Sequence, residues 1–230
     1  MSESGNQPDP KNDDISPFDQ FSKSLEETLQ NSQDPACIPQ DHSLRHYFRQ
    51  ATRRAFSRYR ALHHPEIERH IAEEVLGDFV HMDRIYRLKN EDGQRLTDIT
   101  DMAIEKHRSA EQSGIERDLE VHQHVGDYAL FMAGLFPEFI EPKKNKAEKP
   151  LLAYVGSILK SLNGPKDYYI VEGSSAYSHV SHLYKRLDPN KSGIFHRLAS
   201  RFDEYLEVLS TIRVLLAEPA ADGPQGEIIV

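Results

Sequence analysis

Apolar residues recur every three or four positions along most of this chain, which is the spacing of amphipathic helices. The pattern is clearest towards its end, where Phe195, Leu198, Phe202, Leu209 and Ile212 fall on one stripe. Helices are predicted at about 42–63, 66–88, 96–110, 114–136, 148–162, 166–187 and 192–216. No segment shows convincingly the period of two that is typical of a half-buried strand. We therefore expect an all-α protein, a single-domain helical bundle of about seven helices.

The two ends of the chain differ in composition from its middle. Residues 1–15 and 217–230 are rich in Pro, Gly, Asn, Asp and Ala and have few side chains able to pack. We predict an acidic, largely disordered leader at 1–40, a helical bundle domain at 41–216 and a disordered tail at 217–230. Within the leader, Ser16 and Pro17 suit the start of a short amphipathic helix at about 16–30. This helix is expected to dock on the body of the protein or in a partner's groove.

Cysteine content and hydropathy limit the cellular compartments in which this protein is expected. The single cysteine, Cys37, argues against a disulfide framework and a multi-thiolate metal site. The first residues have neither the positive start nor the apolar run of a secretory signal. The longest apolar run, Tyr128 to Pro137, is about half of the ~20 residues that span a bilayer. A cytoplasmic protein without a membrane partner is expected.

Charge is distributed unevenly along the chain. The net charge of -9 comes from the ends, because residues 1–40 hold eight acidic and two basic residues and residues 217–230 hold three acidic residues. The body is neutral overall, yet HSLRHYFRQATRRAFSRYRALHHP, at 42–65, contains six arginines and no acidic residue. On a helical projection these arginines flank an apolar stripe on both sides. The candidates for binding an anion or a partner are Arg45, Arg49, Arg53, Arg54 and Arg58.

Three hypotheses for this basic helix stay open. Its arginines can pair with carboxylates of neighbouring helices, such as Glu66, Glu73 and Glu74. They can instead form an electropositive strip for phosphate, nucleic acid or an acidic protein, although no nucleic-acid-binding motif supports sequence-specific recognition. Finally, the acidic leader can fold over the strip and compete with a partner.

Histidines and carboxylates within the predicted helices are candidates for a metal site, because such sites in bundles take ligands from at least two helices. In VHQHVGDYALFMAGLFPEF, at 121–139, His122 aligns with the apolar face, and His124 and Asp127 are predicted on the more polar side. Glu172 and His179 are two turns apart on the 166–187 helix, a spacing that helical diiron sites can use. Asp78 falls in the apolar seam of the 66–88 helix, where a carboxylate must be paired, protonated or metal-bound.

The alternative for each of these residues is a hydrogen-bonded place in the core, because twelve histidines in a helical chain align by chance. An axial ligand role for His122 in a haem pocket is a further alternative. The sequence contains no Glu-x-x-His pair and no His-Glu-x-x-His motif. It also has no strand-turn-helix nucleophile elbow and no glycine loop for phosphate, so no complete catalytic signature is present.

Three stretches of the chain contain residue patterns that resemble those of one protein family. HVGDYALFMAGLFPE, at 124–138, resembles a signature of a family of uncharacterised bacterial helical proteins, in which His, Gly-Asp-aromatic, Leu-Phe, Gly and Pro-Glu recur in this order. DFVHMDRIYRL, at 78–88, and DYYIVEGSSAYSHVS, at 167–181, are similar to the family's other recurrent stretches. The resemblance covers residues 66–187, about half the chain, and implies a bacterial, cytoplasmic, all-helical protein. The family has no known activity, so it implies no reaction.

Taken together, the sequence favours a helical interaction or regulatory module that binds a protein, has no cofactor and performs no chemistry. The alternative is an oxidoreductase that holds iron, manganese or haem in the bundle core. A weaker alternative is binding of nucleic acid or another polyanion through the basic helix. Assembly into a homo-oligomer is compatible with all three.

Overall fold

The computed structural model describes residues 43–79, 82–140, 162 and 164–217. These residues all belong to one compact unit. Helices dominate them, and the only β pairing in this part of the chain is an isolated bridge between Lys89 and Arg95. The prediction of an all-α bundle is therefore confirmed. The predicted leader, the tail beyond Ala217 and nearly all of the helix predicted at 148–162 lie outside the described residues.

The basic segment forms α2 (Ser43–Arg58), which is shorter than the helix predicted there. The chain leaves the helix through turns in which the amide of Tyr59 donates to the carbonyl of Phe56, and that of Leu62 to the carbonyl of Tyr59. The predicted apolar stripe of α2 is buried at Phe48, Ala51 and Ala55, and the helix packs against α11 (Phe202–Ala217) and the segment after Pro65. Its arginines consequently lie along the flanks of that contact.

The segment predicted as one helix at 66–88 is interrupted. It consists of α3 (Pro65–Arg69), the π-helix η1 (His70–Leu76), α4 (Gly77–Phe79) and α5 (Met82–Ile85). Each residue of the wider π-helical turn rotates the chain by less than an α-helical residue does. Positions after η1 are therefore displaced from the projection of a continuous α-helix. This explains why Asp78, predicted inside the apolar seam, is only half-buried.

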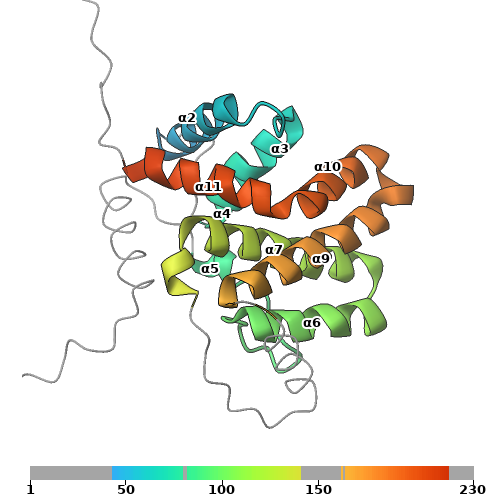
Figure 1. The fold of residues 1–230 in the computed structure, drawn as a ribbon. Coiled ribbons are helices and arrows are strands. Elements are labelled where there is room, and N and C mark those ends of the chain that lie inside the picture. The colour runs from blue at the N-terminus through green and yellow to red at the C-terminus, as the bar shows by residue number, and fades with distance from the viewer. Residues whose placement is uncertain (1–42, 80–81, 141–161, 163, 218–230) are drawn as a thin grey trace, which may run out of the picture. The chain divides into compact units, whose positions relative to one another are not determined.

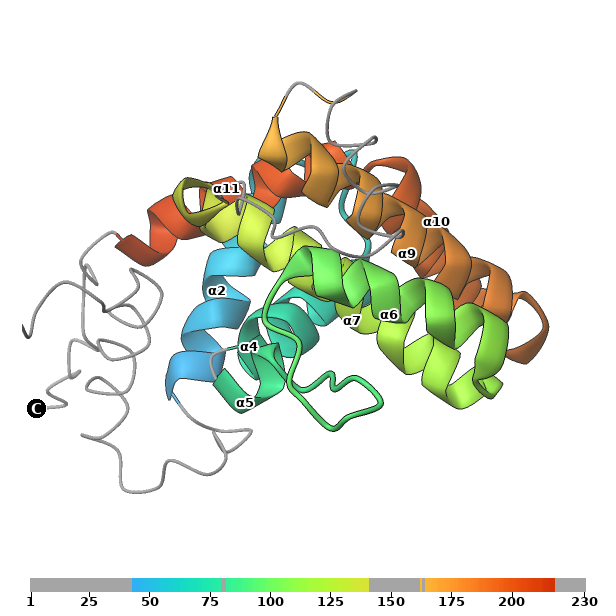
Figure 2. The same ribbon diagram turned by 90° about the horizontal axis from the view of Figure 1, so that it is seen from below.

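Helix α7 (Ile115–Leu135) lies at the centre of the unit and contacts α6, α9, α11 and η1 (Figures 1 and 2). From Val121 to Leu135, every residue except Gln123 is buried. The helix ends where predicted, because Pro137 follows directly after the cap residue Phe136 and starts the short 3₁₀-helix η2 (Pro137–Phe139). From Val121 onwards the helix is packed on all sides, which matters for the polar groups that it carries.

Two further helices enclose the first half of α7. Helix α6 (Ile99–Gln112) begins at Asp98, whose carboxylate accepts a hydrogen bond of 2.7 Å from the amide of Thr100. Helix α9 (Pro165–Leu187) makes a long contact with α7, and glycine permits a close approach at two points. A Cβ atom at Gly126 would lie 2.5 Å from the ring of Tyr177, and one at Gly173 would lie 2.8 Å from the Cβ of Ala129.

The helix predicted at 192–216 is two helices, α10 (Pro189–Ser200) and α11, separated at Arg201. Asp188 caps α10 by accepting hydrogen bonds from the amides of Asn190 and Lys191. The guanidinium of Arg201 donates to the carbonyl of Ala61 at 3.0 Å and so ties the break to the turn after α2. Within the described residues, no helix combines the length and apolar character needed to cross a bilayer.

Candidate metal centre

Three titratable side chains meet where α7 lies against α9. Asp118 and His122 are four residues apart in the first half of α7 and so share one face of that helix. His179 approaches this face from α9. One ligand atom from each residue lies within 4.8 Å of the others, so a carboxylate and two imidazoles converge from two helices.

The carboxylate of Asp118 is the hub of this cluster. Its Oδ1 is 2.9 Å from Nδ1 of His122, and its Oδ2 is 2.8 Å from Nε2 of His179. The two imidazole rings stack with their centroids 3.9 Å apart. Asp118 and His122 are buried, whereas 34% of the His179 side chain is exposed. The cluster is therefore open to solvent on the α9 side and closed on the α7 side.

Electrostatics keep His122 neutral. Burial, together with the neighbouring His179, lowers the pKa of His122 to about 4, and the ammonium of Lys106 acts in the same direction. A neutral imidazole has a lone pair on one nitrogen and a proton on the other, and its partners decide which nitrogen carries the proton. At neutral pH the buried ring is thus in the protonation state that a metal ligand requires.

A buried ion pair lies beside the cluster. The Nζ of Lys106, on α6, is 2.5 Å from Oε2 of Glu172 and 2.8 Å from Oγ of Ser175, both on α9. Both charged side chains are less than a tenth exposed. A buried ammonium needs a carboxylate partner. Glu172, which the sequence suggested as a ligand together with His179, is accordingly bonded to Lys106.

A second histidine–aspartate pair lies in the dry core on the other side of α7. Nε2 of His70, the first residue of η1, is 2.9 Å from Oδ1 of Asp127. The same Oδ1 accepts a hydrogen bond of 2.7 Å from the hydroxyl of Tyr177, and Nδ1 of His70 is 3.0 Å from Oε2 of Glu74. We call these four residues the His70 network. It joins η1, α7 and α9.

The His70 network holds a charged imidazolium. Burial alone would lower the pKa of His70, but the carboxylates of Asp127 and Glu74 outweigh burial and raise this pKa to about 10. Although burial raises the pKa of Glu74, the interaction with His70 lowers it overall. Burial and Asp127 together raise the pKa of Tyr177 far above its usual range. With both ring nitrogens donating to carboxylates, His70 has no lone pair left for a metal.

His124 occupies a third environment. It is fully buried, its Nε2 donates to the carbonyl of Ile85 at 2.8 Å, and its ring packs against Phe79. Burial and Arg87 lower its pKa to about 4. The sequence placed His124 and Asp127 on a polar side of α7, and this is wrong, because neighbouring elements cover that side as well.

The structure thus divides the six predicted ligands. It brings His122 and His179 together, whereas Asp127 and Glu172 are engaged by His70 and Lys106 and His124 by a carbonyl; Asp78 is half-buried on α4 and outside the cluster. Asp118, His70 and Lys106 were not among the residues predicted from the sequence. Asp118 was detectable, because an Asp-x-x-x-His pair places two potential ligands on one helical face.

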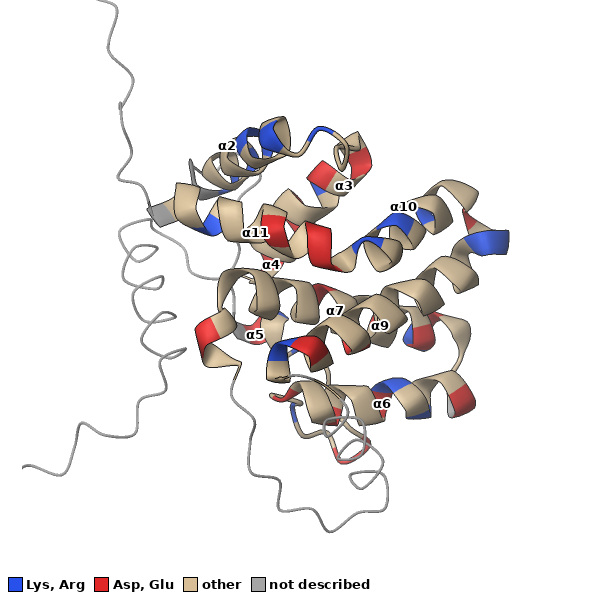
Figure 3. Ribbon diagram, in the orientation of Figure 1, with Lys and Arg blue, Asp and Glu red and all other residues tan. Residues whose placement is uncertain are grey.

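Helix α2, which carries the predicted arginines, lies beside α3 and η1, and α3 carries acidic residues (Figure 3). Arg49 contacts Glu73 at 3.0 Å, as anticipated, and Arg53 lies 3.8 Å from Glu68. The other two predicted partners pair elsewhere, Glu66 with Arg69 and Glu74 with His70. Arg54 and Arg58 are exposed, and Arg45 is half-buried.

Comparison of the chain with models of protein families, with curated protein sequences and with solved structures found no match. The resemblance to a helical family stays a prediction, and arguments about function rest on the geometry of the sites.

Proposed function

We propose that this protein binds a divalent transition metal through Asp118, His122 and His179 and uses it in metal-dependent oxidation. The observation that carries the proposal is the convergence of two imidazoles and one carboxylate from α7 and α9. This donor set, with further positions left open, is that of mononuclear non-haem iron(II) sites. Ferrous iron is therefore the first metal to test.

The spacing of the donor atoms supports the proposal. Two donors that each lie ~2.1 Å from a metal and at right angles to each other are about 3 Å apart. Oδ1 of Asp118 lies 2.9 Å from Nδ1 of His122, and the other oxygen, Oδ2, lies 2.8 Å from Nε2 of His179, so each nitrogen has this spacing from one oxygen of the carboxylate. Binding requires each ring to carry its proton on the other nitrogen. Because the pKa of His122 is lowered to about 4, this rearrangement needs no net loss of a proton from that ring at neutral pH.

The surroundings of the cluster favour a reactive site over a structural one. Structural zinc sites are closed by four protein ligands, whereas three ligands leave positions for water or substrate. The half-exposed side chain of His179 provides a solvent-facing side. The Lys106–Glu172 pair adds a fixed buried dipole next to the metal position.

The test is anaerobic titration of the full-length, chelator-stripped protein with Fe²⁺, and with Co²⁺ as a spectroscopic probe. We expect one bound ion per chain and ligand-field absorption from cobalt. His179→Ala should weaken binding by more than the ~10- to 100-fold that loss of an outer-shell partner costs. His182→Ala is the matched control, because His182 is exposed on the same helix three residues further on. Absence of saturable binding, or equal losses in the two variants, would overturn the proposal.

The interaction module that the sequence favoured stays a second proposal. Its support among the described residues is limited, because the large exposed apolar side chains are spread over three helices, as Ile115, Val171, Leu187 and Val214. Apolar side chains scattered singly are normal on a monomer surface. A metal-free wild-type protein would restore this proposal to first place.

A further inference from the structure

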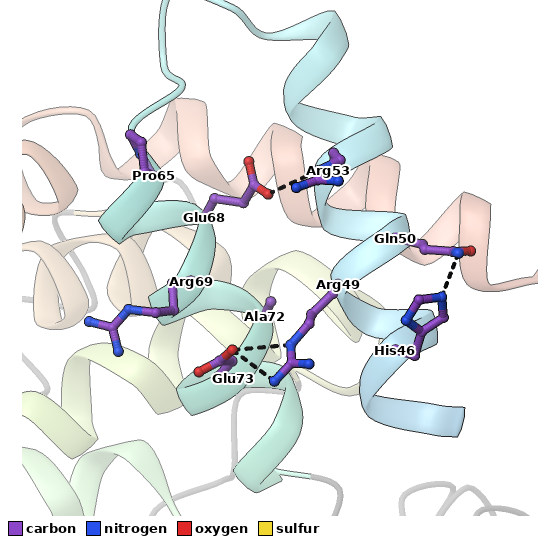
Figure 4. Close-up of a pocket in the computed structure, with 9 residues that line it drawn as sticks. All are labelled: His46, Arg49, Gln50, Arg53, Pro65, Glu68, Arg69, Ala72 and Glu73. Atoms are coloured by element: carbon purple, nitrogen blue, oxygen red, sulfur yellow. Dashed lines mark hydrogen bonds and ion pairs between the residues drawn. The ribbon is translucent and has the colours of Figure 1, made fainter. Parts of the chain in front are cut away.

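A polar groove separates α2 from α3 and η1. It consists of two hollows, one of about 250 Å³ and one of about 780 Å³, and both are lined by Arg53, Pro65 and Glu68. Figure 4 shows the smaller hollow, with α2 on one side and the α3–η1 segment on the other. The shared wall makes the two hollows neighbouring compartments of one groove, which we call the α2–α3 groove.

The lining of this groove is mainly basic. Four arginines contribute to it, Arg49 and Arg69 to the smaller hollow, Arg60 to the larger and Arg53 to both. They face two glutamates, Glu68 and Glu73, so the groove has a net charge of +2 with its histidines neutral. Phe56, the aromatic hydrocarbon side chain in the lining of the larger hollow, is only 1% exposed. The excess of positive charge suits an anionic ligand.

Each of the two glutamates already has a partner at hydrogen-bonding distance. Two nitrogens of Arg49 approach the same oxygen of Glu73, at 3.0 and 3.1 Å. Oε2 of Glu68 is 2.8 Å from Nε2 of His63. Arg49 and His63 thus contact the two acidic groups of the groove. The remaining arginines therefore determine which ligand the groove prefers.

Arg53 and Arg60 are the arginines of the groove whose guanidinium N–H groups have no acceptor at hydrogen-bonding distance within the part of the chain that the structure describes. Nε of Arg53 is 3.8 Å from Glu68, beyond hydrogen-bonding distance, and 85% of its side chain is exposed. Arg60 is exposed, and among the described residues its side chain has no hydrogen bond or ion pair. Arg69 extends away from Arg49 and Arg53 towards Glu66 (Figure 4). The fork of a guanidinium matches two phosphate oxygens at once, so Arg53 and Arg60 are placed to receive a phosphate group.

We infer that the α2–α3 groove binds a small molecule that carries two or more linked phosphates, with Arg53 contacting the phosphate chain and Arg60 its end in the larger hollow. The size of the larger hollow falls in the ~300–1,000 Å³ range of small-molecule sites. The buried Phe56 offers no face on which a base could stack, so recognition concerns the phosphate groups. This site is separate in sequence and structure from the proposed metal centre.

The experiment is titration calorimetry of full-length protein with inorganic pyrophosphate, using orthophosphate and sulfate as weaker competitors. EDTA is present throughout, so that pyrophosphate cannot be held by a metal at Asp118, and success or failure is independent of the metal proposal. We expect one pyrophosphate per chain, bound at least tenfold tighter than orthophosphate. Arg53→Ala should weaken binding at least tenfold and Arg60→Ala at least threefold, each with a shallower dependence on salt.

The basic helix supplies its own control. Arg58 is exposed on α2 but does not line either hollow, so Arg58→Ala should leave the affinity unchanged within twofold. In addition, Glu68→Gln keeps an acceptor for His63 but removes a negative charge from the shared wall, and should tighten binding severalfold. Absence of saturable binding, or a loss in Arg58→Ala equal to that in Arg53→Ala, would overturn the inference. The second of these results would identify general attraction of polyanions by the helix.

Discussion

Two aspartates of the central helix α7 each contact a buried histidine, and these two histidines have pKa values shifted in opposite directions. The carboxylate of Asp118 contacts His122 and His179, and the pKa of His122 is lowered to about 4. Asp127 receives His70 and Tyr177, and the pKa of His70 is raised to about 10. Both histidines are buried. A carboxylate at hydrogen-bonding distance therefore does not by itself decide whether a buried histidine is charged.

The difference comes from the groups beyond the first carboxylate. His70 has a second one, because Nδ1 contacts Glu74, and two negative charges compensate for the loss of hydration. His122 instead has a second imidazole and the ammonium of Lys106 nearby, and both oppose a further positive charge. The His70 network is thus a satisfied ion network that fixes three elements. The Asp118 cluster keeps His122 neutral and has an open side at His179, which is what a metal site needs.

Removing the central carboxylate of the His70 network should have the largest effect on folding. Asp127→Ala leaves a buried imidazolium with one partner and the hydroxyl of Tyr177 without its acceptor, and is expected to cost about 3–5 kcal/mol of unfolding free energy. Asp118→Ala should cost less, about 1–3 kcal/mol, because His122 is neutral and His179 can turn to water. Urea denaturation of both variants measures this. Equal losses would contradict the contrast between a charged and a neutral histidine.

The pH dependence of stability should separate the two sites next. The folded-state pKa of His70 is raised, so its contribution is fully present below the unfolded pKa of ~6.5 and is lost as pH rises towards about 10. The folded-state pKa values of His122 and His124 are lowered to about 4. The unfolded chain therefore binds more protons than the folded protein between about 4 and ~6.5, and stability falls there as pH falls.

Unfolding free energies measured from pH 5 to 10 should accordingly pass through a maximum near neutrality, with a slope of at most ~1.4 kcal/mol per pH unit from each histidine. In His70→Gln the alkaline loss should flatten while the acid loss persists. A variant that retains the wild-type alkaline slope would show that His70 is not charged in the folded protein.

The sequence predicted the helical layers well and the polar contacts poorly, for a physical reason. Periodicity reports which face of a helix is apolar, and it predicted the extent of α7 closely. It cannot report that polar residues on the opposite face are also covered, which is the case for His124 and Asp127. Nor does it report the π-helical turn that displaces Asp78.

Periodicity was limited in the same way in predicting the metal ligands. His122 and His179 were found because both lie in long, strongly patterned helices, but the partner of each depends on the rotation of α9 against α7. Gly126 and Gly173 set how closely those helices approach. A glycine has no side chain, so the sequence does not indicate what packs against these two positions. The Asp118–His122 pair is readable from spacing along α7, but its convergence with His179 is a property of packing.

The smallest expected effect tests that packing directly. In Gly126→Ala the added Cβ would lie 2.5 Å from the ring of Tyr177, so the ring must move and its hydrogen bond to Asp127 must lengthen. Overpacking of this kind costs about 1–3 kcal/mol. Gly193→Ala is the matched control, because Gly193 lies within α10 with nothing within 4 Å of its added Cβ, and alanine there should stabilise by about 0.5–1 kcal/mol. If the two sites are as separate as their electrostatics suggest, Gly126→Ala should lower stability and the pKa of His70 while cobalt affinity at the Asp118 cluster stays within threefold of wild type. A parallel loss of cobalt affinity would mean instead that the rotation of α9 couples the two sites, so that the His70 network sets the geometry of the Asp118 cluster.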